Sequence, residues 1–63
     1  MEIKAVRREK RITQQRLSEV SGIDQSSISR MENGKQGISI SNLYLIADAL
    51  EVPVEYLFRG GSQ

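Results

Sequence analysis

The stretch that decides the fold is residues 13–34, which read Thr13-Gln14-Gln15-Arg16-Leu17-Ser18-Glu19-Val20-Ser21-Gly22-Ile23-Asp24 and then Gln25-Ser26-Ser27-Ile28-Ser29-Arg30-Met31-Glu32-Asn33-Gly34. Thr13 and Asp24 are residue types that cap helix N-termini, and Gly22 and Gly34 suit the left-handed backbone that follows a helix end. The stretch therefore predicts two short helices, at about residues 14–21 and 25–32. Apolar residues three or four positions apart give the helices inward faces, formed by Leu17, Val20, Ile28 and Met31.

Only Gly22, Ile23 and Asp24 join these two helices. A three-residue turn with a glycine between two short helices is the helix-turn-helix pattern. Because such a turn is too tight for antiparallel packing, we expect the helices to cross steeply. One side of the second helix then stays free to enter the major groove of DNA. The spacing alone does not establish that function, because any compact all-α domain has tight corners.

Three further short helices are predicted, at about residues 2–10, 40–50 and 53–58. Ser39 is the expected cap of the second, and Pro53 suits the first turn of the third. Their inward apolar positions are Ile3, Val6, Ile40, Leu43, Ile46, Ala47, Leu50, Leu57 and Phe58. The predicted fold class is all-α, with one compact domain over residues 1–58 and a flexible tail over 59–63.

Composition excludes several classes of function. The chain has 63 residues and contains neither cysteine nor histidine. Disulfides, Cys/His zinc sites and Ser-His or Cys-His nucleophiles are therefore ruled out. No apolar run approaches the roughly 20 residues of a membrane span, and the N-terminal residues do not form a signal peptide. We expect a cytoplasmic protein without a cofactor or metal that is not an enzyme.

Charge is unevenly distributed although the net charge is only +1. Residues 1–35 carry eight Lys or Arg side chains against five Asp or Glu, whereas residues 36–63 carry one Arg against three carboxylates. A basic half suggests a polyanionic partner. Solvated faces that differ by chance would explain the same distribution.

The outward face of the helix at about 25–32 strengthens the DNA interpretation. Its side chains are polar hydrogen-bonding groups, without the Glu/Lys pairs of an ordinary solvated face. Gln, Asn and Arg are also the side chains that read base edges through paired hydrogen bonds. The residues on this face are Gln25, Ser26, Ser29, Arg30 and Asn33.

Three stretches of the chain resemble a known family. Residues 6–18 (Val-Arg-Arg-Glu-Lys-Arg-Ile-Thr-Gln-Gln-Arg-Leu-Ser) are similar to the opening of lambda-repressor/Cro, or XRE-type, helix-turn-helix domains. Residues 22–34 resemble their turn, recognition helix and cap, and residues 43–52 their fourth helix and its exit. The resemblance covers about residues 3–58. Ser18 departs from the usual Ala, which is tolerable if its hydroxyl bonds back to a carbonyl, and Ile38 stands where Pro is frequent.

The resemblance implies a five-helix domain that binds duplex DNA sequence-specifically, as a homodimer on a roughly palindromic operator. The base-reading positions would be Gln25 (to adenine), Ser26, Ser29 and Arg30 (to guanine). The positions that contact the DNA backbone would be Gln14, Asn33 and Lys35. Arg7 and Glu32 match a family salt bridge between the first and third helices. Asp24 is interpreted as a helix cap, with hydrogen bonding to cytosine as its alternative role.

Leu45 lies off the apolar stripe of its helix. If it lies near the apolar residues of the last helix, the group would form a patch, and a patch suggests an interface. The predicted dimer contacts are Leu45, Val54, Tyr56 and Phe58, with packing inside the domain as the alternative. The function expected overall is a transcriptional regulator, specifically a repressor. The alternative is a protein-interaction module, such as an adaptor or antitoxin-like partner, that has lost DNA binding.

Overall fold

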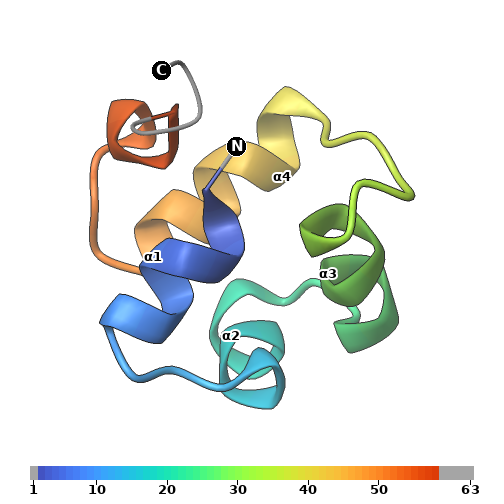
Figure 1. Cartoon of the computed structure of the whole chain (residues 1–63), viewed down its shortest axis with the longest axis horizontal. Coiled ribbons are helices and arrows are strands. Elements are labelled where there is room, and N and C mark those ends of the chain that lie inside the picture. The colour runs from blue at the N-terminus through green and yellow to red at the C-terminus, as the bar shows by residue number, and fades with distance from the viewer. Residues whose placement is uncertain (1, 59–63) are drawn as a thin grey trace.

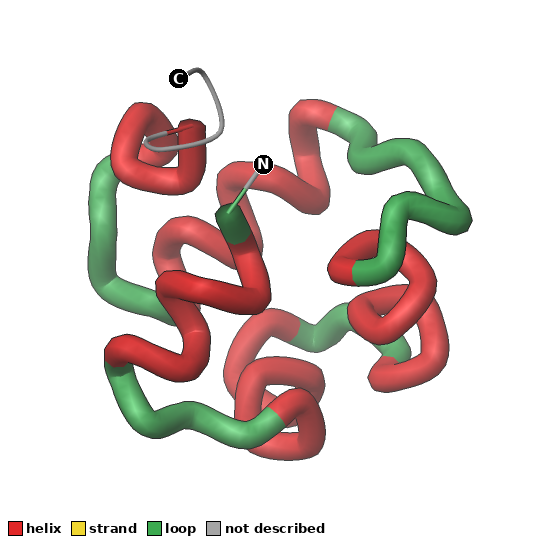
Figure 2. The backbone as a smooth tube through the Cα atoms, viewed as in Figure 1, coloured by secondary structure: helices red, strands yellow, loops and turns green. Residues whose placement is uncertain are grey.

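The computed structural model describes residues 2–58, which form helices and loops without any strand (Figures 1 and 2). The predicted tail at 59–63 lies outside the described residues. In chain order the elements are α1 (Ile3–Glu9), α2 (Gln14–Ser21), α3 (Gln25–Glu32), α4 (Ile40–Ala49) and the 3₁₀-helix η1 (Val54–Phe58). The all-α prediction is confirmed, with one correction: the fifth helix is a single 3₁₀ segment that begins after Pro53. No helix in the described part has the length and apolar content that a membrane crossing needs.

Side-chain caps fix where the three central helices begin. The Thr13 hydroxyl accepts a 3.0 Å hydrogen bond from the Arg16 amide, and the Ser39 hydroxyl accepts one of 3.1 Å from the Asn42 amide. A carboxylate oxygen of Asp24 accepts a 3.1 Å bond from the Ser26 amide. Each bond satisfies an amide that has no partner inside its helix. The three predicted caps are therefore confirmed.

Left-handed residues end the helices and turn the chain. Gly22 and Gly34 have φ angles of +79° and +71°, as predicted for residues that follow helix ends. Arg11 and Glu51 take the same conformation after α1 and α4, with φ angles of 60° and 59°. A residue with a Cβ atom adopts this conformation at a cost of about 1–2 kcal/mol.

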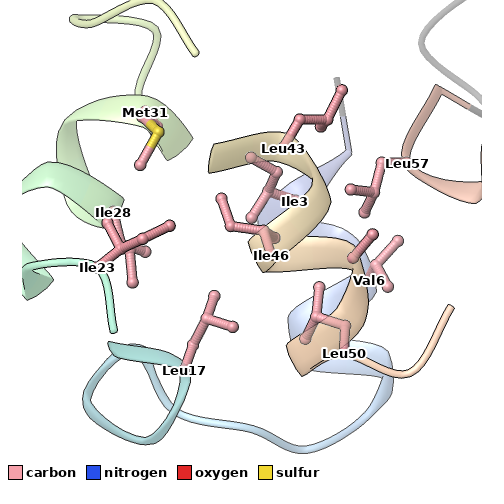
Figure 3. Close-up of a cluster of buried hydrophobic side chains, with 11 residues drawn as sticks. Ile3, Val6, Leu17, Ile23, Ile28, Met31, Leu43, Ile46, Leu50 and Leu57 are labelled. Atoms are coloured by element: carbon pink, nitrogen blue, oxygen red, sulfur yellow. The ribbon is translucent and has the colours of Figure 1, made fainter. Parts of the chain in front are cut away.

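Every helix contributes to one hydrophobic core (Figure 3). A backbone bond of 2.7 Å from the Glu2 amide to the Leu57 carbonyl joins η1 to the start of α1. The first and last helices of the described chain therefore lie next to each other, and both contribute side chains to the core. Its buried side chains are Ile3, Val6, Leu17, Ile23, Ile28, Met31, Leu43, Ile46, Ala47, Leu50 and Leu57.

Three residues that the sequence placed in the core are instead exposed. Val20 is 52% exposed because α2 buries the position four residues after Leu17, which is Ser21, and not the position three residues after it. Ile40, the first residue of α4, is 73% exposed because the buried stripe begins at Leu43. Phe58 is 48% exposed. In a domain this small, the ends of short helices extend past the core.

Candidate nucleic-acid interface

The turn between α2 and α3 is held by side-chain hydrogen bonds. The Ser18 hydroxyl donates a 2.6 Å bond to the Ile23 carbonyl, and the Ile23 amide donates a 3.1 Å bond to the Ser21 hydroxyl. Ser18 is tolerable in place of Ala if its hydroxyl bonds back to a carbonyl; the hydroxyl does bond a carbonyl, but it is that of Ile23, further along the chain in the turn. Because Ile23 is buried and both of its backbone groups are paired, the turn holds α3 at a fixed angle to α2.

A buried ionic network ties α3 to the two preceding helices. Nε of Arg7 lies 2.7 Å from Oε2 of Glu32, and Nη2 donates a 3.2 Å bond to Oε1. Nε2 of Gln14 donates a further bond of 3.0 Å to Oε1. The side chains of Arg7 and Glu32 are only 11% and 1% exposed. The predicted salt bridge is therefore present, and Gln14 joins it from α2.

The charge of Glu32 is stabilised despite its burial. Burial alone would raise the pKa of Glu32, but hydrogen bonds from Arg7 and Gln14 outweigh it. The positive charges of Arg7 and Lys4 act in the same direction, and the pKa lies below its ordinary value of 4.5. Glu32 therefore holds α3 as a carboxylate at neutral pH.

The polar face of α3 is accessible. Gln25, Ser26 and Arg30 are exposed and Ser29 is half-buried, so the four predicted base-reading residues lie on one helix. Just past its end, the predicted backbone contacts Asn33 and Lys35 are also exposed. We call these six residues the α3 face. It combines hydrogen-bonding groups with two cationic side chains, which is the chemistry of a surface that binds DNA.

Asp24 acts as a cap at the start of this face. The Ser26 hydroxyl donates to the carboxylate oxygen that also accepts from the Ser26 amide. The hydrogen bond from that hydroxyl is the largest cause of the lowered pKa of Asp24, followed by a bond from the Ser27 backbone. The structure thus supports the capping interpretation of Asp24. It also commits the Ser26 hydroxyl hydrogen, so Ser26 would accept a hydrogen bond from a base amino group and would not donate one to a phosphate.

Two residues that sequence reasoning missed contact Arg30. Its Nε donates a 2.8 Å bond to Oε1 of Gln36, and its Nη2 donates a 3.2 Å bond to the Ser27 hydroxyl. Ser27 lies three positions before Arg30, a spacing that brings side chains together on a helix and could have indicated the contact. Gln36 lies in the loop after α3, and no local sequence pattern predicts its position.

Exposed apolar side chains also lie on α4 and η1, which pack against each other. Leu45 and Phe58 are 45% and 48% exposed, whereas Val54 and Tyr56 are half-buried against the core. Tyr44, which the sequence analysis did not single out, is 60% exposed because it also lies off the buried stripe of α4. The four predicted contact residues thus divide between surface and core edge. Tyr44 and Val54 line an open cavity of about 360 Å³ together with Ala47, Asp48, Val52, Pro53 and Glu55.

Comparison with known proteins identifies the family. A family model described as helix-turn-helix matches residues 3–57, nearly the whole described chain. The chain belongs to this helix-turn-helix family. The resemblance to lambda-repressor/Cro-like domains is thereby confirmed.

Two relatives and one solved structure show where this helix-turn-helix domain occurs. The chain is 37% identical over 57 residues to the HTH-type transcriptional repressor RghR of Bacillus subtilis (strain 168), covering 89% of this chain and 42% of the relative. It is 40% identical over 47 residues to an uncharacterized transcriptional regulator in the ATPase CF(0) region of Rhodospirillum rubrum, covering 75% and 44%. The chain thus spans less than half the length of these relatives. The crystal structure of the restriction-modification controller protein C.AhdI from Aeromonas hydrophila matches with a TM-score of 0.87 and 30% identity, covering 89% of this chain and 85% of that one.

Proposed function

We propose that this domain is a sequence-specific double-stranded DNA-binding transcriptional repressor that reads the major groove with α3. The observation that carries the proposal is the exposed α3 face. A tight turn, in which both backbone groups of Ile23 are hydrogen-bonded, and a buried ionic network hold this face at a fixed angle to the rest of the domain. A rigid helix with Gln and Arg side chains outward fits direct readout of base edges.

The roles of the residues divide by chemistry. Gln25 and Arg30 carry the side chains that form paired hydrogen bonds with adenine and guanine, and Ser29 adds a shorter contact. Lys35 and Asn33 bind phosphates and set the register. Gln14 contributes through its backbone amide, because the first amides of a helix lack intrahelical partners and favour an anion.

The relatives support a regulatory role. One is named as a transcriptional repressor, another as a transcriptional regulator, and the matching structure is a restriction-modification controller. The activity of the whole protein belongs to this proposal, because the chain spans less than half of the two regulators. A repressor that binds DNA would act in the cytoplasm, where the DNA lies.

We further propose that the domain binds a roughly palindromic operator as a homodimer through α4 and η1. Tyr44, Leu45 and Phe58 expose large apolar side chains there. The two elements pack against each other, and exposed apolar side chains that gather on one surface would mark an interface. A two-fold dimer would present two α3 faces to two half-sites about one helical turn apart.

Selection of bound duplexes from a random pool tests the function, followed by titration of the best duplex at several salt concentrations. A dimer that neutralises about 6–10 phosphates should lose affinity with a slope of roughly −0.9 per contact in log affinity against log salt. Enrichment of one sequence with a steep slope is the expected result. A flat salt response without enrichment would remove the DNA-binding proposal and favour an interaction module.

A further inference from the structure

The Arg30 side chain is held in place without DNA. Nε donates to Gln36 at 2.8 Å, and Nη2 donates to Ser27 at 3.2 Å. One partner lies a turn earlier on α3, and the other lies on the loop after it. An arginine side chain otherwise has several freely rotating bonds, so two contacts restrict where its guanidinium lies.

The backbone after α3 explains how Gln36 reaches Arg30. Gly34 takes a left-handed conformation with φ +71°, which reverses the chain at the helix end. The Lys35 amide then donates a 2.8 Å hydrogen bond to the carbonyl of Arg30 itself. The next residue, Gln36, is thereby brought alongside the side chain of the same arginine.

We propose that Gln36 is a positioning residue for sequence readout, because it orients the Arg30 guanidinium towards a guanine. This inference rests on the proposed DNA-binding function and adds a specificity-determining residue to it. With Nε engaged by Gln36, the Nη1 group has no partner among residues 2–58. Nη1 and the second hydrogen of Nη2 therefore remain for O6 and N7 of guanine. A guanidinium that is already oriented loses less conformational freedom on binding.

The contact itself can be measured in the free protein. Nitrogen-edited NMR follows the Nε–H proton of Arg30, whose exchange with water slows when it is hydrogen-bonded. We expect faster exchange in Gln36→Ala than in the wild type, and slow exchange in Gln36→Glu, which keeps an acceptor oxygen. Equal exchange in all three proteins would overturn the proposal, because Gln36 would not hold Arg30.

The effect on readout is measured with a duplex that the wild-type protein selects from a random pool. The Arg30→Ala variant identifies the base pair at which the preference depends on Arg30. Duplexes with each other base pair at that position are then compared with the selected duplex. Gln36→Ala should lower discrimination at that base pair by about threefold to tenfold, the value of one exposed hydrogen bond. Gln36→Glu should keep the discrimination but weaken all duplexes alike, because it adds a carboxylate near phosphates. Gln15→Ala removes a different glutamine, which is exposed on α2, and should leave the preference unchanged.

A double variant separates positioning from an independent contact. Arg30→Ala with Gln36→Ala should discriminate no worse than Arg30→Ala alone, because Gln36 acts only through Arg30. The proposal would be overturned if the losses of discrimination in the two single variants were additive in the double variant. It would also be overturned if Gln36→Ala weakened binding to all sequences equally, or if Gln36→Ala bound DNA more tightly than the wild type. If Arg30→Ala relaxes the preference while Gln36→Ala does nothing, only the positioning role fails. If the wild type enriches no sequence, the proposed function fails with it.

Discussion

Arg30 and Lys35 are both exposed cations of the α3 face, but they differ in where they lie. Arg30 belongs to α3, whereas Lys35 lies in the loop beyond it. A guanidinium on the helix can form paired bonds with a base edge, whereas an ammonium on the loop binds phosphate as a point charge. The two side chains should therefore contribute differently to specificity.

Arg30→Ala should weaken the best duplex by about 1–3 kcal/mol and relax the preference at one base pair per half-site. Lys35→Ala should weaken all sequences nearly alike and make the salt slope shallower by about one unit. The measurement is a complete single-substitution scan of the selected duplex against both variants. Equal losses on selected and random duplexes for Arg30→Ala would reduce Arg30 to a backbone contact, and readout would then depend on Gln25, Ser29 or DNA shape.

Glu32 links stability to pH. Its folded-state pKa lies below the ordinary value of 4.5, so the unfolded chain binds more protons as the pH falls. The stabilisation by its charge is fully present above that unfolded-state value and is lost as the pH falls through the lower folded-state pKa. Because the Arg7–Glu32 pair is largely buried, removing one partner should cost about 3 kcal/mol or more at neutral pH.

Glu32→Gln should thus be markedly less stable than the wild type at pH 7, and the difference should shrink as the pH is lowered below 4.5, the ordinary pKa of the glutamate side chain. Urea unfolding at a series of pH values measures both effects. Glu19→Gln is the matched control, since its ion pair with Arg16 is exposed and spans 3.4 Å. Such surface pairs contribute about 0–1 kcal/mol. A constant difference between wild type and Glu32→Gln at all pH values would contradict this assignment.

At the scale of the elements, the turn after α2 depends on one glycine. Gly22 has φ +79°, and an added Cβ atom would meet nothing within 4 Å. Any cost of a side chain there is therefore conformational and not steric. Gly37 offers a direct comparison, because its surroundings are equally open and its φ is not in the left-handed region.

Gly22→Ala should lower the unfolding free energy by about 1–2 kcal/mol. A loss of 1 kcal/mol corresponds to a thermal midpoint lower by about 4–8 °C in a domain of this size. Gly37→Ala should be neutral or slightly stabilising, because it restricts only the unfolded chain. Thermal unfolding followed by circular dichroism compares the two. Equal midpoints would show that the turn does not need its left-handed residue.

Helix positions could be predicted from the sequence because the signals are local. Thr13, Asp24 and Ser39 cap the helices at which the sequence analysis placed them, and α2 and α3 have the predicted bounds. Burial at helix ends could not be predicted in the same way. Val20 and Ile40 satisfy the helical period, but which edge of a short helix reaches the core depends on how the helices cross.

The candidate site, too, could be predicted only in part. The outward residues of α3 follow from the helical period, and the Arg7–Glu32 pair follows from the family resemblance. The contact between Gln36 and Arg30 did not follow from either, because it depends on the path of the loop after Gly34. The bond from Ser18 to the Ile23 carbonyl is a similar case, since it spans the turn and not a helix.

At the scale of the whole molecule, the two exposed surfaces are proposed to act together. The α3 face would contact one half-site, and the surface on α4 and η1 would set the spacing to the second. Leu45 is the sharpest probe of that surface because it is 45% exposed and lies off the buried stripe of α4. Replacing it should not disturb the core.

Leu45→Glu should shift the protein towards monomer in sedimentation and weaken binding to a palindromic duplex, with helicity nearly unchanged. A charge in an apolar interface has lost its water without gaining a partner, which opposes association. Val20→Glu is the matched control, since Val20 is 52% exposed on α2, outside the proposed interface. It should leave association unchanged. If both variants associate like the wild type, the dimer does not form through Leu45; if Leu45→Glu unfolds, Leu45 stabilises the domain itself and the interface proposal is wrong.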